Sequence, residues 1–385
     1  MNVEQKRIFM WVNFYKDRQE VGITKKIKSE IQTLKNMGYE VYYTSYLEEG
    51  VAICNDNNEI VAQRTLKTQK KTFLLSQQLI EIAIEYLEKN SFDYALLRIN
   101  RFTKKYMKML KVLKDKGTFV MMESLSYFPE LRYRDLSSFG YKIFWHEIKK
   151  KKNCLKRYVD LMLTEGKIRE FWGIPSVELS MGVDVDSLPQ HDYQGRCDEI
   201  NMIMVGCSSI YHGTDRILNS MADYYKSPSH VVDVNLHLVG DILEQDARLI
   251  EKLNLRNYVY CYGKKYGAGL YEIYDKCNVA LGPLAQYRVK KKDTGLKTKE
   301  YLAIGIPYVY AGVEDRLPKD YKYIFQVSDD DAMIDIHKII DFYFSIKEES
   351  DIVPKMREDA KKYYSWEDIF NRIFESVKKL KEDFE

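Results

Sequence analysis

Short apolar runs alternate with longer amphipathic segments along the chain. Residues 8–12 form an apolar run with the length and composition of a buried strand. The segment 23–37 then repeats apolar residues at helical spacing, and Gly38 ends it before a second apolar run at 41–44. A strand, a glycine-containing loop, a helix and a strand in this order are typical of a parallel sheet, so we expect an α/β protein.

The same alternation continues to the end of the chain in two series. Before residue 184, further helices are predicted at 73–87, 104–114 and 139–157, and further strands at 94–98, 118–122, 161–164 and 177–180. After residue 198, strands are predicted at 201–205, 234–239, 258–262, 279–281 and 308–310, and helices at 214–225, 243–253, 270–276 and 296–304. The chain is predicted to end with two more helices, at 330–346 and 366–380.

The length of the chain and a break in the pattern predict two domains. A single core stops growing at roughly 250–300 residues, and this chain has 385. The stretch 184–197 contains polar residues, proline and glycine with little periodicity, as a linker does. We therefore expect two Rossmann-like domains, 1–183 and 198–364, facing each other across a cleft.

The composition is that of a globular protein and does not favour nucleic-acid binding. Hydrophobic residues make up 45%, and 60 basic and 57 acidic residues leave a formal net charge of +3. A nucleic-acid-binding domain would concentrate basic charge, so no nucleic-acid partner is expected. The lysine clusters at 149–152 and 290–292 are typical of solvated faces, with attraction of the first cluster to anionic lipid head groups as the alternative.

Cysteine usage and hydropathy bear on metal binding and location. The six cysteines contain no C-x-x-C pair, so no zinc site is expected, and Cys207, Cys261 and Cys277 lie among apolar residues as buried side chains do. The polar N-terminus has no signal-peptide pattern, and no apolar stretch approaches the roughly 18 residues of a membrane span. We expect a cytoplasmic protein, with peripheral attachment to the inner face of the membrane as an alternative.

Four glycine-containing loops follow strands of the second domain, at the edge where a parallel sheet binds ligands. The first, from Gly206 to Gly213, runs into a helix N-terminus, where backbone N–H groups favour phosphate. It does not match G-x-G-x-x-G, which disfavours a nicotinamide or flavin cofactor. The second and third loops contain Gly240 and the pair Gly263-Lys264, and each by itself is typical of a tight turn.

The fourth loop, within residues 293–307, is the most specific of the four. Thr294 and Gly295 lead into a helix that carries Lys297 and Glu300. A carboxylate in the first turns of such a helix accepts two hydrogen bonds from the vicinal hydroxyls of a ribose. Lys297 lies on the same helical face and would neutralise a diphosphate. By itself, the pair is typical of an ordinary ion pair on a helix surface.

Taken in order, these segments resemble the donor domain of the GT-B glycosyltransferases, in particular the large retaining family four. The segments that match the family's pattern are Val205-Gly206 with His212-Gly213, 236–241, 259–263 with 270–284, 297–307, Tyr364-Ser365-Trp366 and, before the linker, 181–184. The resemblance covers residues 198–310 well and the remainder loosely. It implies that 198–364 is the nucleotide-sugar donor domain, that 1–183 is the acceptor domain, and that 365–385 is a helix that packs back on the first domain.

The resemblance also implies roles for single residues. Glu300 would hold the ribose, Lys297 would lie near the diphosphate, and His212 would lie near the diphosphate or the sugar. Gly22 would line the first-domain loop that approaches the donor phosphates. The other donor-binding positions that it implies are Gly206, Gly213, Gly240, Gly263, Lys264, Thr294 and Gly295.

The chain departs from the family's pattern in three places. Lys292 stands where the family often has a second glutamate, eight residues before Glu300. The paired Arg and Lys after the first strand are absent, as is the Asn of the turn before the linker. Residues 290–292 and Arg288 would supply positive charge from the other side, in which case removing the charges of Lys292 and Lys297 weakens donor binding.

The implied chemistry is transfer of a sugar from a nucleotide-sugar donor to a glycan or lipid-linked acceptor, as in synthesis of bacterial surface polysaccharides or glycoconjugates. The resemblance alone implies the retaining outcome. Positive charge and helix N-termini stabilise a diphosphate leaving group without a metal, so no metal or other cofactor is expected. The catalytic candidates are His212 and Glu123, which ends a strand of the first domain, with Arg98 and His146 as weaker candidates on the acceptor side.

Two other classes of function stay open. A sugar-nucleotide epimerase or hydrolase of the same fold would need carboxylates around the sugar ring. A GT-B scaffold that serves as a non-catalytic binding subunit would tolerate the lysine at position 292. Two acidic patterns are predicted to be structural: Asp184 and Asp186 lie in a turn, and Asp329–Asp331 cap the following helix.

Overall fold

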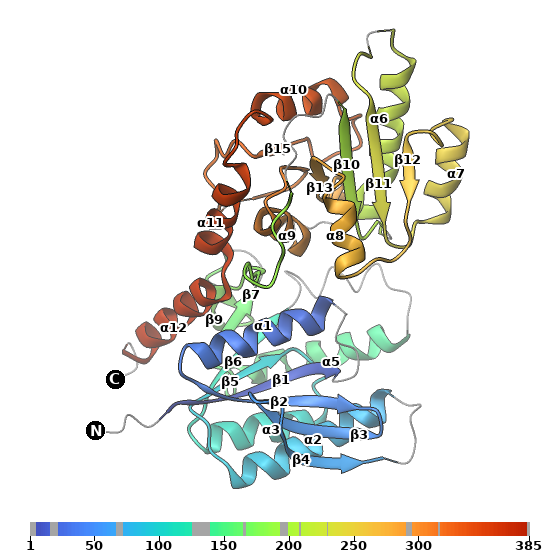
Figure 1. The fold of residues 1–385 in the computed structure, drawn as a ribbon. Helices are drawn as coiled ribbons and strands as arrows, with labels where there is room; N and C mark the ends of the chain where they lie inside the picture. Colours follow the sequence, from blue (N-terminus) through green and yellow to red (C-terminus); the bar gives the residue numbers. More distant parts are fainter. Residues whose placement is uncertain are drawn as a thin grey trace. The chain divides into compact units, whose positions relative to one another are not determined.

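The computed structural model describes residues 5–382 apart from 16–21, 67–71, 125–138, 165–166, 193–198, 208, 229, 290–294 and 315. The chain forms two compact units. The first unit is Met1–Ser180 together with Trp366–Glu385, and the second unit is Met181–Ser365. Each unit is built around its own sheet (Figure 1).

A nine-stranded sheet forms the centre of the first unit, in the order β4-β3-β2-β1-β5-β6-β7-β9-β8. Its strands are β1 Arg7–Tyr15, β2 Glu40–Leu47, β3 Gly50–Asn55, β4 Ile60–Thr65, β5 Tyr94–Arg98, β6 Phe119–Ser124, β7 Leu161–Thr164, β8 Glu170–Phe171 and β9 Ile174–Glu178. From β2 to β9 in this order, neighbouring strands are parallel, whereas β3, β4 and β8 pair antiparallel. The parallel part is the α/β sheet that the alternating pattern predicts.

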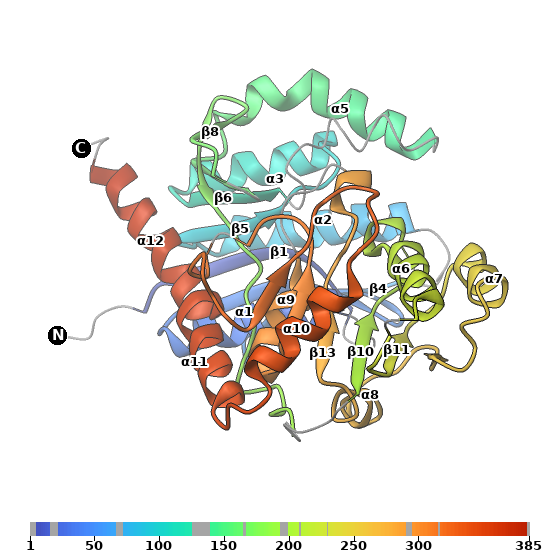
Figure 2. The same ribbon diagram turned by 90° about the horizontal axis from the view of Figure 1, so that it is seen from above.

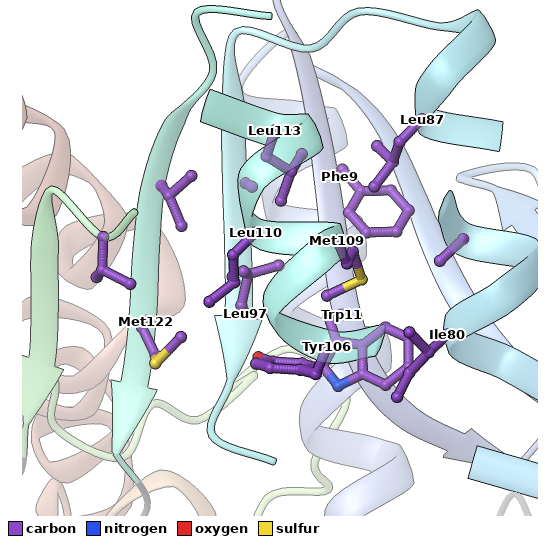
Figure 3. Close-up of a cluster of buried hydrophobic side chains, with 14 of the residues drawn as sticks. Phe9, Trp11, Ile80, Leu87, Leu97, Tyr106, Met109, Leu110, Leu113 and Met122 are labelled. Carbon is purple, nitrogen blue, oxygen red and sulfur yellow. The ribbon is translucent and has the colours of Figure 1, made fainter. Parts of the chain in front are cut away.

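Helices cover both faces of this sheet. They are α1 Gly22–Asn36, α2 Thr72–Lys89, α3 Lys104–Asp115, α5 Phe139–Leu155 and α12 Trp366–Glu382. Successive side chains of a strand point to opposite faces, so Ile8 and Met10 of β1 pack with α1 and α12, whereas Phe9 and Trp11 pack with α2 and α3 (Figure 3). Because both faces are covered, β1 is a continuous apolar run in the sequence.

Helix α12 returns the end of the chain to the first unit, which confirms the prediction for this helix. Trp366, Ile369, Phe370 and Ile373 are buried, and their spacing of three and four residues places them on one face of the helix. Helix α12 lies beside α1 (Figures 1 and 2). The last helix is therefore part of the first unit's core.

The antiparallel hairpin of β3 and β4 is absent from the predicted elements. A turn joins its strands, and Asn58 adopts a φ of 63° there. At the other end, a Cβ on Gly50 would lie 2.1 Å from the carbonyl oxygen of Arg64, so only glycine allows this approach of the two backbones. The periodicity of a short apolar run does not show which strand it pairs with.

A six-stranded, fully parallel sheet forms the centre of the second unit, in the order β12-β11-β10-β13-β14-β15. Its strands are β10 Ile200–Val205, β11 Val234–Val239, β12 Val259–Cys261, β13 Val279–Leu281, β14 Tyr308–Tyr310 and β15 Ile324–Gln326. Its helices are α6 Thr214–Lys226, α7 Glu244–Lys252, α8 Ala268–Tyr274, α9 Leu296–Ile304, α10 Ile336–Ile346 and α11 Ile352–Tyr364. The strand order reverses between β10 and β13, which is where a doubly wound sheet binds its ligand.

The helices of the second unit form two layers. Helices α6, α7 and α10 cover one face, where they pack on Met202 and Met204 of β10. Helices α8, α9 and α11 cover the other face, where they pack on Ile203 and Val205. Both faces of the sheet are therefore buried, as expected of a Rossmann-like domain.

Four predicted features of the second unit are wrong. Helix α10 begins at Ile336 rather than at residue 330, and α11 forms where the pattern predicts no helix. Asp335, not Asp329–Asp331, caps α10, because its carboxylate accepts a hydrogen bond of 3.0 Å from the backbone N–H of His337. Cys261 is exposed at the end of an edge strand rather than buried.

The missed helix α11 has a charged sequence with Pro354 in its first turn. Proline is compatible with the first turn of a helix, because the N–H that it lacks has no partner within the helix there. The buried face of α11 consists of widely spaced apolar residues among many charges, so tertiary packing rather than local pattern supports this helix.

The segment after Ser180 is fastened to the second unit. The guanidinium of Arg357 on α11 donates hydrogen bonds to the carbonyls of Val185 (2.9 Å) and Pro189 (3.1 Å). The ring Nε2 of His191 lies 3.0 Å from the carbonyl oxygen of Tyr274 at the end of α8. Residues 185–191 are thus held by α11 and by the end of α8, two helices that cover the same face of the sheet.

Candidate functional site

Three of the glycine loops of the second unit lie side by side at the carboxyl edge of the sheet. The backbone N–H of Gly206 donates to the carbonyl of Val239 (2.8 Å), and that of Gly240 donates to the carbonyl of Gly263 (2.8 Å). A Cβ on Gly240 would lie 3.4 Å from the Cα of Gly206. The close packing of these backbones brings together loops that are separated in the sequence.

Helix α9 begins at the edge between β10 and β13. The hydroxyl of Tyr301 donates to the carbonyl of Leu281 and accepts from the backbone N–H of Val205, both at 3.3 Å, so it joins the ends of the two strands. One turn earlier, Thr298 packs on Gly282: a Cβ on this glycine would lie 2.7 Å from Thr298 Cγ2. The first turn of α9 therefore lies where the strand order reverses.

His212 lies at the same edge, in a short 3-10 helix between β10 and α6. Its carbonyl accepts a hydrogen bond of 3.0 Å from the backbone N–H of Leu284, which follows β13. Its ring lies against the first glycine loop, since a Cβ on Gly206 would lie 3.8 Å from His212 Nε2. The structure thus places His212 at the ends of both strands that flank the reversal point.

The environment of His212 keeps its ring neutral. Burial lowers the pKa of His212 to about 4; the positive charge of Lys297 adds to this effect, and a hydrogen bond that the ring donates to the backbone of Ser209 opposes it. The influence of Lys297 shows that these two predicted site residues lie close enough to interact. At neutral pH, His212 is a hydrogen-bond donor and acceptor rather than a cation.

Lys297 and Glu300 form an ion pair on α9, with 2.6 Å between Lys297 Nζ and Glu300 Oε2. Their side chains are 34% and 21% exposed, so both reach the surface while their stems are covered. The first turn of α9 contains no acidic residue, and its N-cap is Gly295, which has no side chain to cap the helix. The positive end of this helix, with Lys297, favours an anion.

The remaining predicted donor-side residues differ in their surroundings. Gly213 is the N-cap of α6 with a φ of 70°, and a Cβ there would lie 3.0 Å from Leu284 Cβ. Lys264 is exposed and pairs with Asp241 at 2.6 Å. Thr294 and the lysines at 290–292 lie outside the described residues.

The guanidinium of Arg288 is occupied by carboxylates. It forms two hydrogen bonds to Asp215 (2.7 and 3.0 Å) and one to Asp331 (2.8 Å). These contacts fasten the loop after β15 to the start of α6, and they balance the charge of Arg288. They give Asp331 a role other than the predicted helix cap.

In the first unit, Glu123 belongs to a buried cluster of four charged side chains, which we call the ion cluster. Glu123 Oε1 lies 2.5 Å from Lys26 Nζ, and Glu123 Oε2 lies 2.8 Å from Arg98 Nε. Glu30 completes the ion cluster, at 2.8 Å from Arg98 Nη2 and 3.4 Å from Lys26 Nζ. The side chains come from α1 and from the carboxyl ends of β5 and β6.

The ion cluster strongly favours the charged form of Glu123. Burial alone would raise the pKa of this carboxyl, but Lys26 and Arg98 outweigh burial and lower the pKa to about 2. A carboxylate with so low a pKa is a weak base at neutral pH. The arrangement fits a role for Glu123 in holding the two cations.

Other first-unit predictions have less structural context. Gly22 is the first residue of α1, and His146 is exposed on α5. Lys26 and Glu30 are not among the residues predicted from the sequence, although their separation of four residues on a helix is a signal for an ion pair. Lys26 Nζ also lies 5.5 Å from the ring centroid of Trp366, which joins the ion cluster to α12.

Among the described residues, no group of three or more His, Cys, Asp or Glu side chains is placed to hold a metal ion. Asp184 lies in a turn, as predicted, where its carboxylate accepts a hydrogen bond of 3.3 Å from the backbone N–H of Ser187. In the same described part of the chain, none of the helices has both the length and the apolar character needed to cross a bilayer.

The structure aligns over nearly its whole length with solved glycosyltransferases. A glycosyltransferase from Rickettsia africae has a TM-score of 0.63 at 13% identity, with 98% of this chain and 99% of that chain covered. Sucrose-phosphate synthase from Thermosynechococcus elongatus has a TM-score of 0.66 at 16% identity, covering 97% and 99%. HepE from Anabaena, solved in complex with UDP-glucose, has a TM-score of 0.55 at 12% identity, covering 97% and 99%.

No protein-family model matches the sequence, and a search of curated proteins finds no match. The sequence identities to these solved structures are 13%, 16% and 12%, so the structural similarity shows the fold alone. The protein therefore has the fold of the GT-B glycosyltransferases, which consists of two Rossmann-like domains.

Proposed function

We propose that this protein is a glycosyltransferase that moves a sugar, of the hexose type, from a nucleotide-sugar donor to a glycan or lipid-linked acceptor. The observation that carries the proposal is the gathering of His212, Lys297 and Glu300 with the glycine loops at the reversal point of the second sheet. We call this set of residues the candidate donor site. It belongs to a fold that solved glycosyltransferases share over their full length.

The candidate donor site suits the three parts of a nucleotide sugar. Glu300 accepts hydrogen bonds from the ribose hydroxyls, and Lys297 with the glycine-capped starts of α6 and α9 binds the diphosphate. The neutral ring of His212 donates a hydrogen bond to a phosphate or sugar oxygen. HepE, which was solved in complex with UDP-glucose, supports a donor of this class.

The proposed chemistry depends on stabilising the departing diphosphate. Lys297 and the helix N-termini oppose the charge that develops on it, so the reaction proceeds without a metal. The resemblance to family four adds a retaining outcome to the proposal. In the first unit, we assign Glu123 to holding Lys26 and Arg98 on the acceptor side, because its low pKa disfavours proton transfer.

The proposed setting is synthesis of a surface polysaccharide or glycoconjugate in the cytoplasm. Helix α5 exposes Lys149 and Lys150, which supports a peripheral attachment to anionic lipid where the acceptor is lipid-linked. An acceptor of this kind would be brought to the enzyme at the membrane surface.

A thermal-shift screen against uridine, guanosine and adenosine diphosphate sugars tests the proposal. A donor that binds only the folded state stabilises it by about 2.7 kcal/mol at 100 times its Kd. Purified protein should then transfer or slowly hydrolyse the donor that stabilises it. A protein that no nucleotide sugar stabilises would contradict the proposal.

The Glu300→Gln variant ties donor binding to the candidate donor site. Because hydrogen bonds to a charged group contribute about 1.5–3 kcal/mol, we expect donor affinity to fall about 10- to 100-fold. Glu251→Gln is the matched control, since Glu251 is an exposed, ion-paired carboxylate on α7 of the same unit. Equal donor affinity in both variants would remove Glu300 from the site.

Two outcomes of the same measurements would indicate a different function. Donor binding without transfer or hydrolysis would indicate a non-catalytic binding subunit. If the protein isomerises or hydrolyses the donor, and adding an acceptor does not lead to sugar transfer, the protein is an epimerase or hydrolase.

A further inference from the structure

A buried cluster of three polar side chains joins helix α9 to two other parts of the second unit. Lys299 Nζ lies 2.9 Å from Glu314 Oε2, and both side chains are only 2% exposed. The hydroxyl of Tyr364, at the end of α11, donates a hydrogen bond to Glu314 Oε1. Lys299 Nζ also lies 5.1 Å from the ring centroid of Tyr364, so each of the three side chains contacts the other two.

Stability alone does not account for this cluster. Removing a lysine and a glutamate from water costs several kcal/mol per ion, and apolar residues of similar volume often stabilise a core as well or better. Lys299 also lies in the first turns of α9, where the helix dipole opposes a positive charge. A buried ion pair in such a place provides a fixed geometry, because both partners must keep their positions to stay paired.

The cluster holds α9 in position, and α9 carries Lys297 and Glu300 of the candidate donor site. Lys299 directly precedes Glu300 and follows Lys297 by two residues, so it leaves α9 about 100° around the helix from Glu300. Lys297 and Glu300 occupy the half-exposed side, whereas Lys299 reaches into the core. A rotation of α9 about its axis would break the contact of Lys299 with Glu314.

The other attachments of α9 limit its movement along the axis. At its C-terminal end, a Cβ on Gly305 would lie 2.7 Å from Val353 Cγ1, so α9 and α11 are in close contact there. Tyr364 ends α11, and its carbonyl accepts a hydrogen bond of 2.8 Å from the backbone N–H of Val183. The cluster therefore connects the start of α9 to an element that is itself anchored at both ends.

We propose that Lys299, Glu314 and Tyr364 are positioning residues that set the rotation of α9 and thereby the orientation of Lys297 and Glu300 toward a nucleotide-sugar donor. The inference rests on the proposed function. The three residues do not touch the donor and act through α9.

The Tyr364→Phe variant tests the inference, because it removes one hydroxyl and keeps the ring beside Lys299. We expect Kd for the nucleotide sugar that most stabilises the wild type, with UDP-glucose as the first probe, to rise about tenfold. We expect kcat to fall as well, because Lys297 also opposes the charge that develops on the departing diphosphate. We also expect faster hydrogen–deuterium exchange of the amides of residues 296–304. A merely structural role would lower the melting temperature without changing Kd at temperatures well below it.

Tyr308→Phe is the matched control. Tyr308 is fully buried in the same apolar cluster as Tyr364, and its hydroxyl has no hydrogen-bond partner among the described residues. This variant should keep the wild-type Kd and the wild-type exchange of α9. Glu314→Gln serves as a second test variant should Tyr364→Phe fail to fold, with the same expected direction.

The outcomes separate the inference from the proposed function. If the wild type binds a donor and both Tyr364→Phe and Glu314→Gln bind it with the wild-type Kd, the inference is overturned. The proposed function is unaffected by that result. A wild type that binds no nucleotide sugar would refute the proposed function. In that case unchanged exchange of α9 in both variants would also refute the positioning role, and faster exchange would show that the cluster orders α9 for another ligand.

Discussion

Burial changes what a single residue, His212, contributes to the candidate donor site. A lysine at this position would carry a charge at neutral pH. The pKa of His212 is lowered to about 4 by burial, and the positive charge of Lys297 adds to this effect. In the proposed function, Lys297 therefore supplies positive charge toward a diphosphate, and His212 supplies a hydrogen bond.

The lowered pKa predicts a pH dependence of stability. Because the unfolded histidine, with a pKa near 6.5, binds a proton before the folded one, the stability due to neutral His212 is complete above about pH 6.5 and is lost as the pH falls toward 4. From pH 7 to pH 5, His212→Asn should lose about 2 kcal/mol less free energy of unfolding than the wild type. Hydrogen exchange of the β10 and β11 amides, corrected for intrinsic rates, measures this difference.

An exposed histidine of the same unit provides the control for this measurement. His230 is exposed near the end of α6, and His230→Asn controls for the replacement of a histidine by asparagine outside the site. A His212→Asn protein with the same pH dependence as His230→Asn would contradict the lowered pKa.

At the scale of elements, helix α9 is held against the ends of β10 and β13 by close packing at one glycine. A Cβ on Gly282 would lie 2.7 Å from Thr298 Cγ2 and 3.2 Å from Tyr310 Cβ. Threonine is stiff at χ1, so it does not turn away easily, and the start of α9 would have to move instead. The absence of a side chain at this position therefore determines where Lys297 and Glu300 lie.

The Gly282→Ala variant tests this contact. Overpacking of this kind typically costs about 1–3 kcal/mol, so we expect a lower free energy of unfolding of the second unit together with weaker donor binding. Gly269→Ala on α8 is the control, because no described residue other than its chain neighbours and its own helix backbone has an atom within 4 Å of the added methyl group. Alanine also stabilises a helix by about 1 kcal/mol relative to glycine. Gly282→Ala with wild-type stability would show that α9 does not depend on this contact.

At the scale of the whole molecule, two separate cores stabilise the chain, and the last helix belongs to the first of them. Trp366 of α12 is 3% exposed and packs with Ile8 and Met10 of β1, while its ring lies 5.5 Å from Lys26 Nζ of the ion cluster. The first core thus includes a segment, Trp366–Glu385, that follows the whole of the second unit in the sequence.

The Trp366→Ala variant should destabilise the first unit selectively, by about 3–5 kcal/mol, because it leaves a large cavity beneath α12. Tryptophan fluorescence reports on this unit, since all four tryptophans lie in it, and three remain in the variant. Ile339→Ala removes a fully buried side chain of α10 in the second unit and should leave the fluorescence midpoint in urea unchanged. Equal shifts of the midpoint in the two variants would mean that the units unfold as one.

The local pattern of apolar residues and glycines was sufficient to predict most helices and strands of the second unit. The predicted ranges 234–239, 279–281, 296–304 and 308–310 are the observed bounds of β11, β13, α9 and β14. Each of these elements has a clear apolar pattern and ends at or near a glycine, and both signals lie within a few residues of the chain. The hairpin of β3 and β4 and helix α11 lacked such signals, because tertiary partners stabilise them.

The sequence by itself determined the class of fold and the residues that follow the strands, because periodicity and glycine placement act locally. Only the tertiary structure decided which polar and charged groups from distant parts of the sequence meet. Glu123 binds Lys26, 97 residues away, and Tyr364 binds Glu314, 50 residues away. Those contacts form only when folding brings segments that are distant in the sequence together. The resulting burial and neighbouring charges then set the protonation of groups such as Glu123 and His212.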